Sequence, residues 1–541
     1  MSTDEPARDG RWTVLEQDQR FSRSVLWRLQ RTYYDRQGPR AWHDREVPND
    51  ATCNTYLAAA YAEVVIAYLH ELVRTGKLVA TAPVHVVELG AGVGAFAAYF
   101  LRALDELRRA SSLRDLDVRY VMTDFTPSNL RRWGEHPQLR PLVDDGRLAF
   151  GTFDVDADDA IALADGAALG PGSCANPVVI VANYAFDAFR QELFRVHAGA
   201  LQEVRVTTRA PGDGPVDLAR LDLLATLRTQ YRYQDVDAAG YHGNPIHDQL
   251  LAAYQARLVD TTFTMPVVGL DAVERLLALA GGRGLLLSSD KGYTQADELD
   301  HRAHQPMQLH AGCFSMMVNY HAIGSYFEAR GGVYAATSRR ALNLKTALCV
   351  RGDAGDDFVD TVAMFRRRFD EFGPGELYEY LELWRAREAP LDQFLALLRL
   401  SGYDPGLFHQ RAELVRRQCH GITDALSVEL RVAIDRVWAN YFAGLQNLPY
   451  ELGRVLLALD RPHEAARFHH FAIDWYGESP AACLSLGACY YHAEDPAQAL
   501  RWFQRARNLQ PDLAVAHQWI ARIEAEGERA AARTFPAPSP G

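Results

Sequence analysis

Short apolar runs alternate with longer amphipathic stretches through the middle of the chain. Five of these runs are rich in β-branched residues and flanked by glycine or proline, which favours strands over buried helices. Strands that alternate with helices in this way are typical of a mostly parallel α/β sheet. The predicted strands are VHVVEL (84–89), VRYVMTD (118–124), RLAFGTFD (147–154), VVIVAN (178–183) and GLLLSSD (284–290).

A polar residue stands at or near the end of each predicted strand. In an open α/β sheet, ligands bind in the crevice beyond the carboxyl ends of the strands. Any one polar residue could simply mark where a strand meets solvent, but five together predict one crevice lined by polar groups. The five are Glu88, Asp124, Asp154, Asn183 and Asp290.

The segments around these strands predict further elements. Apolar residues recur at intervals of three and four in YLAAAYAEVVIAYLHELV (56–73), as in an amphipathic or buried helix. QELFRVHAGALQEVRVTT (191–208) alternates around Ala198-Gly199 and predicts a hairpin, and residues 216–257 are predicted to be helical. An insertion at about 190–265 would therefore lie over the crevice, where a substrate cap belongs.

The last helical region contains a repeat. Gly453, Ala465 and Ala472 recur 34 positions later as Gly487, Ala499 and Ala506, which is the period of tetratricopeptide repeats. Residues 512–525 would form a capping helix, and the helices at 375–445 would support so short an array. We predict that the repeats recruit a protein or peptide partner. The second copy fits the pattern further, with Leu486, Tyr490, Phe503 and Pro511, whereas the first has Leu456 and Gly477 in place of the tyrosine and the proline.

These patterns divide the chain into consecutive regions. The first and last regions are polar, small or proline-rich and have little to bury, so we predict that they lack a packed structure. The predicted regions are a disordered or extended N-terminus (1–20), a helical segment (21–80), an α/β domain (81–350), a helical connector (351–445), helical repeats (446–527) and a disordered tail (528–541).

Composition narrows the class of protein. A formal net charge of −12 argues against a dedicated nucleic-acid binder. The seven cysteines are scattered, which favours reduced thiols over disulfides or a metal site. Because no signal peptide is visible and no apolar run approaches the ~18 residues of a membrane span, we predict a cytoplasmic protein without membrane contact.

The loop after the first strand, in VELGAGVGAF (87–96), carries the candidate chemistry. Glycines at 90, 92 and 94 leave room for a ligand against the backbone and permit positive φ. The following helix presents unpaired N–H groups and a partial positive charge. Such a loop can hold a dinucleotide pyrophosphate or the amino-acid part of S-adenosylmethionine, and Gly90, Gly92 and Ala95 meet the dinucleotide pattern literally.

Two details favour the methyl donor. Glu88 places a carboxylate where a methionine ammonium would lie and would repel a pyrophosphate, and Gly94 makes the spacing G-x-G-x-G. Asp124 can accept both ribose hydroxyls, and Asp154 or Phe153 could contact the adenine. The predicted donor site comprises Glu88, Gly90, Ala91, Gly92, Gly94, Asp124, Phe125, Phe153 and Asp154, with no metal.

Seven motifs occur in order along the first two thirds of the chain. They are Tyr33-Tyr34, the helix at 56–69, VELGAGVG (87–94), TDFTPSNLRR (123–132), NYAFDAF (183–189), SSDKG (288–292) and HAGCFSMMVNYHAI (310–323). Together they resemble the MidA-type class I methyltransferases, relatives of the mitochondrial complex I assembly arginine methyltransferase. The resemblance covers about residues 21–350 and implies a Rossmann-like sheet that binds S-adenosylmethionine, with Asn183, Asp187 and then Asp290 as acceptor-side catalytic residues.

The acceptor half departs from that family's pattern. Tyr184, Phe314 and Asn319 stand where the family carries acids, which puts arginine as the acceptor in doubt. His310 and His321 are further candidate bases. Besides an active methyltransferase, the sequence leaves open a non-catalytic scaffold that acts through its repeats and a nicotinamide-dependent oxidoreductase.

Overall fold

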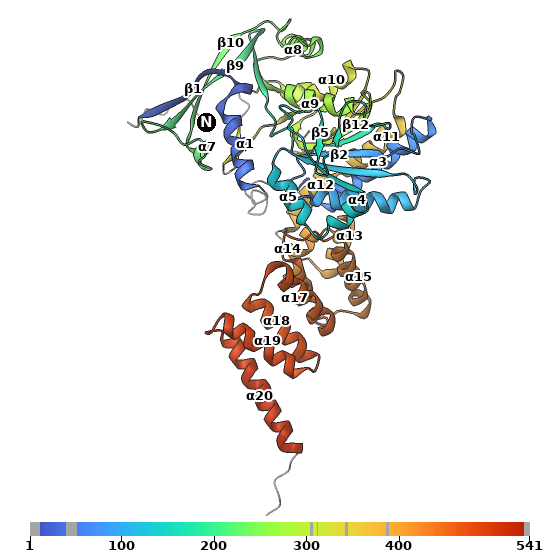
Figure 1. Cartoon of the computed structure of the whole chain (residues 1–541), viewed down its shortest axis with the longest axis vertical. Coiled ribbons are helices and arrows are strands. Elements are labelled where there is room, and N and C mark those ends of the chain that lie inside the picture. Colours follow the sequence, from blue (N-terminus) through green and yellow to red (C-terminus); the bar gives the residue numbers. More distant parts are fainter. Residues whose placement is uncertain are drawn as a thin grey trace, which may run out of the picture. The chain divides into compact units, whose positions relative to one another are not determined.

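The structure of the chain is a computed structural model that describes residues 11–38, 51–302, 307–310, 312–340, 344–385 and 389–534. The chain divides into two compact units, Met1–Leu381 and Glu382–Gly541 (Figure 1). Residues 351–381, predicted as part of a helical connector, therefore belong to the first unit.

A mixed ten-stranded sheet forms the centre of the first unit. Its strands are β2 (Val84–Leu89), β3 (Val118–Asp124), β4 (Leu148–Thr152), β5 (Ile161–Leu163), β6 (Ala168–Leu169), β7 (Val178–Val181), β12 (Gly284–Tyr293), β15 (Val318–Asn319), β16 (Val333–Ala336) and β17 (Leu344–Arg351). Their order is β16-β17-β12-β7-β2-β3-β4-β5-β6, with β15 beside β12. The central pairs from β4 to β12 are parallel, and the pairs at both edges are antiparallel.

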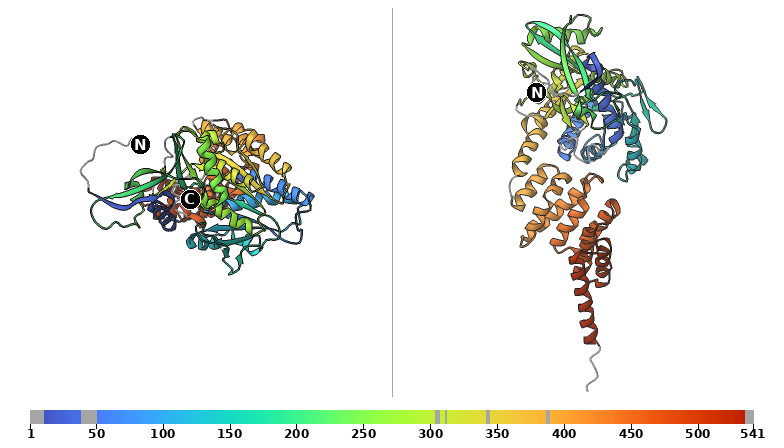
Figure 2. Two further views of the ribbon diagram at one scale, coloured as in Figure 1. Left: turned by 90° about the horizontal axis from the view of Figure 1, so that it is seen from above. Right: turned by 90° about the vertical axis from the view of Figure 1, so that its left-hand side faces the viewer.

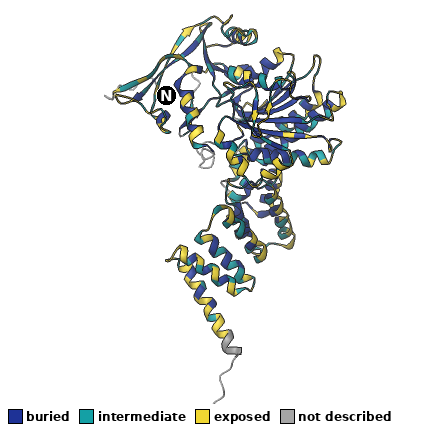
Figure 3. Cartoon of the chain, viewed as in Figure 1, coloured by how far each residue is buried: buried dark blue, intermediate teal, exposed yellow. Residues whose placement is uncertain are grey.

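All five predicted strands are present in this sheet. Every residue of β2 and of β7 is buried, as expected for parallel strands covered on both faces. Figure 3 shows much of the central sheet in dark blue, the colour of buried residues. Successive strands β2, β3 and β4 proceed toward one edge, and the chain then crosses to β7 on the other side of β2. This reversal between β2 and β7 is a topological switch point, where open α/β sheets bind ligands.

Helices surround the sheet. The first unit contains η1 (Phe21–Arg23), α1 (Val25–Gln37), α3 (Thr55–Arg74), α4 (Ala95–Arg109), α5 (Pro127–Glu135), α6 (Arg140–Asp144), α7 (Leu223–Thr226), α8 (Pro245–Arg257), α9 (Val267–Ala278), η2 (Ala296–Leu299), α10 (Tyr320–Ala329), α11 (Val359–Arg366), η3 (Arg367–Glu371) and most of α12 (Pro374–Arg385). The apolar face of α4 predicted from its spacing is buried at Phe96, Phe100 and Leu104.

Helix α3 is long and apolar enough to cross a membrane by length and composition, contrary to the expectation from apolar runs. In the structure, 67% of its apolar window is buried within the chain. It packs against α4 and α11, and this packing accounts for its apolar character.

A second, five-stranded antiparallel sheet lies beside the first. It consists of β1 (Trp12–Arg20), β8 (Glu192–His197), β9 (Ala200–Pro211), β10 (Arg228–Asp235) and β11 (Thr261–Met265). The predicted hairpin corresponds to β8 and β9, which turn at Ala198 (φ 50°) and Gly199 (φ 79°). Figure 2 shows β1, in blue, against the green strands of this sheet. A small ladder of β13 (Gln308–His310) and β14 (Cys313–Ser315) lies apart from both sheets.

The prediction of helices throughout 216–257 is wrong over 228–235. In RTQYRYQD every second residue is half-buried, and this alternation suits a strand that pairs with β9. Residues 12–20, predicted as disordered or extended, form β1 because the other edge of β9 is open to them. Sequence alone cannot supply these two long-range pairings.

The second unit is all helical. It contains α13 (Leu391–Leu400), α14 (Pro405–Gln418), α15 (Asp424–Asn440), α16 (Leu448–Ala458), α17 (Pro462–Tyr476), α18 (Pro480–His492), α19 (Pro496–Leu509) and α20 (Ala514–Thr534). The tail predicted to be disordered from residue 528 thus continues as helix to residue 534. The sequence EAEGERAAART is rich in strong helix formers, which explains the extension.

Two hairpins of this unit make the same contact 34 residues apart. A Cβ added at Gly453 in α16 would lie 2.6 Å from the ring of His469 in α17. A Cβ added at Gly487 in α18 would lie 2.6 Å from the ring of Phe503 in α19. The period found in the sequence therefore has a physical basis in close helix approach.

We expect Gly487→Val to destabilise the second unit by about 1–3 kcal/mol, because the fully buried Phe503 ring has no space to retreat. The measurement is thermal unfolding followed by circular dichroism. Gly527→Val is the matched control, since Gly527 is also helical but has nothing within 4 Å of its added Cβ. Equal unfolding temperatures for the two variants would contradict the close approach of α18 and α19.

Candidate functional site

A pocket of about 450 Å³ opens at the carboxyl ends of β2, β3, β4 and β7. It contains the switch point between β2 and β7 and has the size of a ligand site. Most of the predicted site residues line it. These are Glu88, Gly90, Ala91, Gly92, Asp124, Phe125, Phe153, Asp154, Asn183 and Asp187.

The glycine loop forms one wall of the pocket. Gly90 (φ 66°) and Gly92 (φ 55°) both have left-handed backbone, which glycine adopts at little cost. The Gly92 carbonyl accepts a 2.9 Å hydrogen bond from Trp133 Nε1, which fixes the loop against α5. A Cβ at Gly90 would meet nothing within 4 Å. This wall of the pocket therefore consists of backbone without side chains, and Trp133 holds it in position.

Gly94 does not line the pocket, contrary to its prediction as a donor-binding residue. It precedes α4 with φ 87°, and an added Cβ would lie 2.7 Å from Cε of Met122 in β3. Its role is to let α4 start close to the sheet. Close packing of α4 against β3 thus requires glycine at position 94, whereas the pocket requires glycine at positions 90 and 92.

Glu88 is the most unusual charge in the pocket. The residue is only 5% exposed, and its Oε2 atom is enclosed without a hydrogen-bond partner. Burial raises the pKa of the Glu88 carboxyl to about 8. The nearby Tyr120 hydroxyl partly offsets this rise, but it makes no hydrogen bond of normal geometry. Glu88 is therefore a buried acid without a positive partner among the residues that the structure describes.

Asp124 is buried and already well hydrogen-bonded. Its Oδ1 accepts from the Thr126 backbone N–H (2.9 Å) and hydroxyl (2.6 Å), and its Oδ2 accepts from Asn129 Nδ2 (2.8 Å). A carboxylate has about four acceptor positions, so one remains on Oδ2. In this conformation Asp124 can receive one further donor, whereas both hydroxyls of a ribose were predicted.

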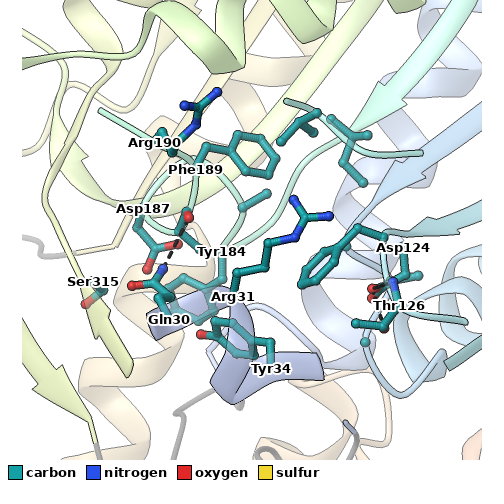
Figure 4. Close-up of a pocket in the computed structure, with 18 of the residues that line it drawn as sticks. Gln30, Arg31, Tyr34, Asp124, Thr126, Tyr184, Asp187, Phe189, Arg190 and Ser315 are labelled. Carbon is teal, nitrogen blue, oxygen red and sulfur yellow. Dashed lines mark hydrogen bonds between the residues drawn. The ribbon is translucent and has the colours of Figure 1, made fainter. Parts of the chain in front are cut away.

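Arg31 crosses the pocket and was not predicted. It comes from α1, forms a bidentate ion pair with Asp154 (3.0 and 2.5 Å), and its guanidinium lies 4.5 Å from the centre of the Phe125 ring. Figure 4 shows it between Asp124 on one side and Tyr184 and Asp187 on the other. Asp154, predicted near an adenine, is therefore engaged by the chain's own arginine.

The acceptor-side residues cluster around two aspartates. Asn183 Oδ1 accepts from the Tyr61 hydroxyl (2.8 Å) and the Ser289 N–H (3.1 Å), while its enclosed Nδ2 has no partner. The Asp187 backbone N–H donates to Asp290 Oδ2 at 3.2 Å, and Asp187 Oδ1 is enclosed with no hydrogen-bond partner among the described residues. Asp290 is fully buried behind Asp187 and does not line the pocket.

Burial raises the pKa of both aspartates, and the neighbouring charge of Asp187 raises that of Asp290 further. Lys291 acts in the opposite direction on Asp187 and lowers its pKa. Asp290 is therefore the more readily protonated of the two, and Asp187 presents its Oδ1 atom to the pocket. An enclosed carboxylate backed by a protonated one is suited to accept a proton.

Of the other acceptor-side candidates, two line the pocket and three do not. Tyr184 lines the pocket with a left-handed backbone (φ 45°), and His310 lines it with Nε2 3.0 Å from Ser315 Oγ. His321 lies outside the pocket lining and hydrogen-bonds the Tyr254 hydroxyl. Phe314 packs on Trp27, and Asn319 caps α10, so both have structural roles.

Sequence reasoning missed the contribution of η1 and α1 to the pocket. This cover is attached by Gln30, which donates to the Ala188 carbonyl (3.2 Å) and accepts from the Phe314 N–H (3.4 Å). The arginines at 23, 28 and 31 and Tyr34 also line the pocket. Helix α1 is itself rich in polar residues, so these arginines did not stand out, and nothing in the sequence says that α1 folds over the sheet.

Comparison with protein-family models and with curated proteins gives no match. Two solved structures from Burkholderia thailandensis are similar to the chain. One is an uncharacterized protein (17% identity, TM-score 0.38), and the other is a member of the same superfamily, inferred to be a methyl transferase and bound to S-adenosyl-homocysteine (16% identity, TM-score 0.40). Each match covers 64% of this chain and 90% of the other. TM-scores below 0.5 do not establish a shared fold, so the function is inferred from the pocket itself.

Proposed function

We propose that the chain is an S-adenosylmethionine-dependent methyltransferase of the Rossmann-like class I type. The observation that carries the proposal is the Glu88 carboxyl, enclosed beside bare glycine backbone, with no hydrogen-bond partner for Oε2 among the described residues. Burial keeps this carboxyl protonated near neutral pH, and a cationic ligand beside it favours the ionised form and pairs with it. The methionine ammonium of S-adenosylmethionine is such a cation.

The remaining groups of the pocket fit the rest of that molecule. The N-terminal end of α4, directly after the loop, favours a carboxylate. Asp124 retains one acceptor position for a ribose hydroxyl. The buried Phe153 offers an apolar surface for an adenine. The strand reversal beside this loop also supports a nucleotide site there.

Bound S-adenosylmethionine supplies an electrophilic methyl group on its sulfonium. The chain then needs to place an acceptor in line with that methyl and to take up any proton the acceptor loses. Asn183 Nδ2 and Asp187 Oδ1 are the enclosed, unpartnered atoms on the acceptor side. We assign Asn183 to orient the acceptor and Asp187 to receive its proton.

A nicotinamide dinucleotide fits the same pocket less well. Its pyrophosphate would lie against the glycine loop beside Glu88, where it would gain no ion pair and would repel the carboxylate whenever Glu88 is ionised. In isothermal titration calorimetry, we expect S-adenosylmethionine and S-adenosylhomocysteine to bind with micromolar Kd and NAD to bind at least 100-fold more weakly. Tighter binding of NAD would contradict the proposal.

A scaffold that keeps the pocket without catalysis is the second candidate, because Arg31 already occupies part of the space beside Phe125. Incubation with tritiated S-adenosylmethionine and cell lysate separates the two. Labelled product supports the methyltransferase, and donor binding without any labelled product favours the scaffold.

We also propose that the second unit recruits a protein partner as a short tetratricopeptide array, and that the protein acts in the cytoplasm. The repeated glycine–ring contacts of the two hairpins support the array.

A further inference from the structure

Three cations of the pocket lining, Arg23, Arg28 and Lys291, form no salt bridge within the described part of the chain, and we call them the rim. Arg23 and Arg28 line the pocket and are exposed. Within the described part of the chain, neither forms an ion pair or a side-chain hydrogen bond. The Lys291 ammonium is bonded only to Gln308 Oε1, at 3.3 Å. All three line the same pocket and are available to a ligand.

This rim differs from the other charges of the pocket. Arg31 pairs with Asp154, and Arg190 pairs with Asp156 at 2.7 Å, so these four charges compensate each other. The whole chain carries 69 acidic residues against 57 basic ones, which makes unpaired arginines at a concave site unexpected from composition. Arginine at such a place is suited to bidentate binding of carboxylates and phosphates.

Asp187 lines the same pocket as the rim, and Asp290 is fully buried behind it. Lys291 connects the rim to this pair of aspartates, because its backbone N–H donates to Asp290 Oδ1 at 2.7 Å and the residue also lines the pocket. A cationic acceptor would meet three positive groups before it reached Asp187. An anionic acceptor would be held by the rim and could place a neutral O–H or N–H against Asp187 Oδ1.

We propose that the methyl acceptor is a small anionic molecule, bearing a carboxylate or phosphate, that Arg23, Arg28 and Lys291 anchor above Asp187. This inference rests on the proposed methyltransferase function and names its substrate class. It also makes Arg23 and Arg28 substrate-binding residues, a role that no motif of the sequence assigns to them.

The acceptor, Asp187 and the methyl donor together account for every proton and electron pair that moves in the methyl transfer. The acceptor's O–H or N–H proton passes to Asp187 Oδ1, and the lone pair left on oxygen or nitrogen attacks the donor methyl. A C–O or C–N bond forms as the C–S bond breaks, and its electron pair returns to sulfur. The positive sulfonium becomes the neutral thioether of S-adenosylhomocysteine, and Asp187 becomes neutral.

The test uses inorganic phosphate as the anionic probe at pH 7.5, titrated calorimetrically into the full-length protein saturated with S-adenosylhomocysteine. We expect millimolar binding to the wild type and at least tenfold weaker binding to the double variant Arg23→Ala, Arg28→Ala. Arg36→Ala is the matched control, since Arg36 is on α1 outside the pocket lining and donates to the Ala219 carbonyl. Its phosphate affinity should equal that of the wild type.

A third variant tests whether the bound anion lies over the aspartate. Asp187→Asn removes a like charge, so phosphate should bind about threefold more tightly than to the wild type. Unchanged affinity would contradict the placement of the anion above Asp187.

The outcomes separate the two levels of the proposal. Failure of S-adenosylhomocysteine itself to bind would overturn the methyltransferase, and the acceptor class with it. Normal S-adenosylhomocysteine binding with no phosphate binding, or with equal phosphate binding by the double variant, would overturn the anionic acceptor alone.

Discussion

Replacement of Gly92 by aspartate is expected to abolish S-adenosylmethionine binding, with Kd raised at least 1,000-fold in calorimetric titration. Gly92 is buried in the pocket wall, and Trp133 holds its carbonyl from behind, so the loop cannot retreat from a new side chain. The added carboxylate would enter the donor space and place a second negative charge near Glu88. Aspartate tolerates the left-handed backbone better than most residues, so the fold should survive.

The matched control is Gly166→Asp. Gly166 also has positive φ (91°), and nothing lies within 4 Å of its added Cβ, but it is in the turn between β5 and β6, outside the pocket lining. Both variants should unfold at similar temperatures, and only Gly92→Asp should lose the donor. A folded Gly92→Asp protein that binds the donor as the wild type does would show that the site lies elsewhere.

The second large effect concerns the charge of Glu88. Glu88→Gln keeps the shape of the side chain and removes the negative charge, so the ammonium loses a charge-assisted hydrogen bond. We expect about 100-fold weaker donor binding at pH 7.5, or roughly 3 kcal/mol. Glu106→Gln, on the exposed face of α4, is the control and should bind normally.

The pH dependence of binding gives a sharper signature. The free Glu88 carboxyl has a pKa near 8, whereas an ammonium beside it favours the ionised form and lowers that pKa. Binding at pH 6 to 7.5 must therefore release a proton, and affinity should rise up to tenfold per pH unit. Glu88→Gln should show no such rise, and a wild type with flat affinity over this range would contradict the ammonium site.

The same variant should be stable. The pKa of Glu88 lies above its ordinary value of 4.5 in the folded protein, so this group lowers the free energy of unfolding progressively as pH rises from about 4.5 to 8. Removal of the charge should therefore make the ligand-free variant at least as stable as the wild type at pH 7.5. Loss of binding together with loss of stability would indicate misfolding instead.

The centre of the fold could be predicted from the sequence because its signals are local. Continuous apolar runs such as that of β7 and the glycine loop after β2 determine their own conformation. The polar strand ends did converge, since Glu88, Asp124, Asp154 and Asn183 line one pocket. Asp290 was expected in the same crevice but lies behind Asp187, because β12 continues past it to Tyr293.

What could not be predicted depends on contacts between distant segments. The pairing of β1 with β9 joins residues 185 to 199 positions apart, and that of β10 with β9 joins residues 19 to 33 positions apart. The cover by α1 and the ion pair of Arg31 with Asp154 join segments 123 positions apart. The hydrogen bonds that already occupy Asp124 are local, but only the geometry of the turn at Thr126 shows that they form.

A crystal structure of the protein with S-adenosylhomocysteine would show whether Glu88 binds the amino group of the donor. We expect electron density for the ligand against the glycine loop, with its amino nitrogen within hydrogen-bond distance of a Glu88 carboxylate oxygen. Density that places the amino group away from Glu88, or a diphosphate bound at that loop, would contradict it.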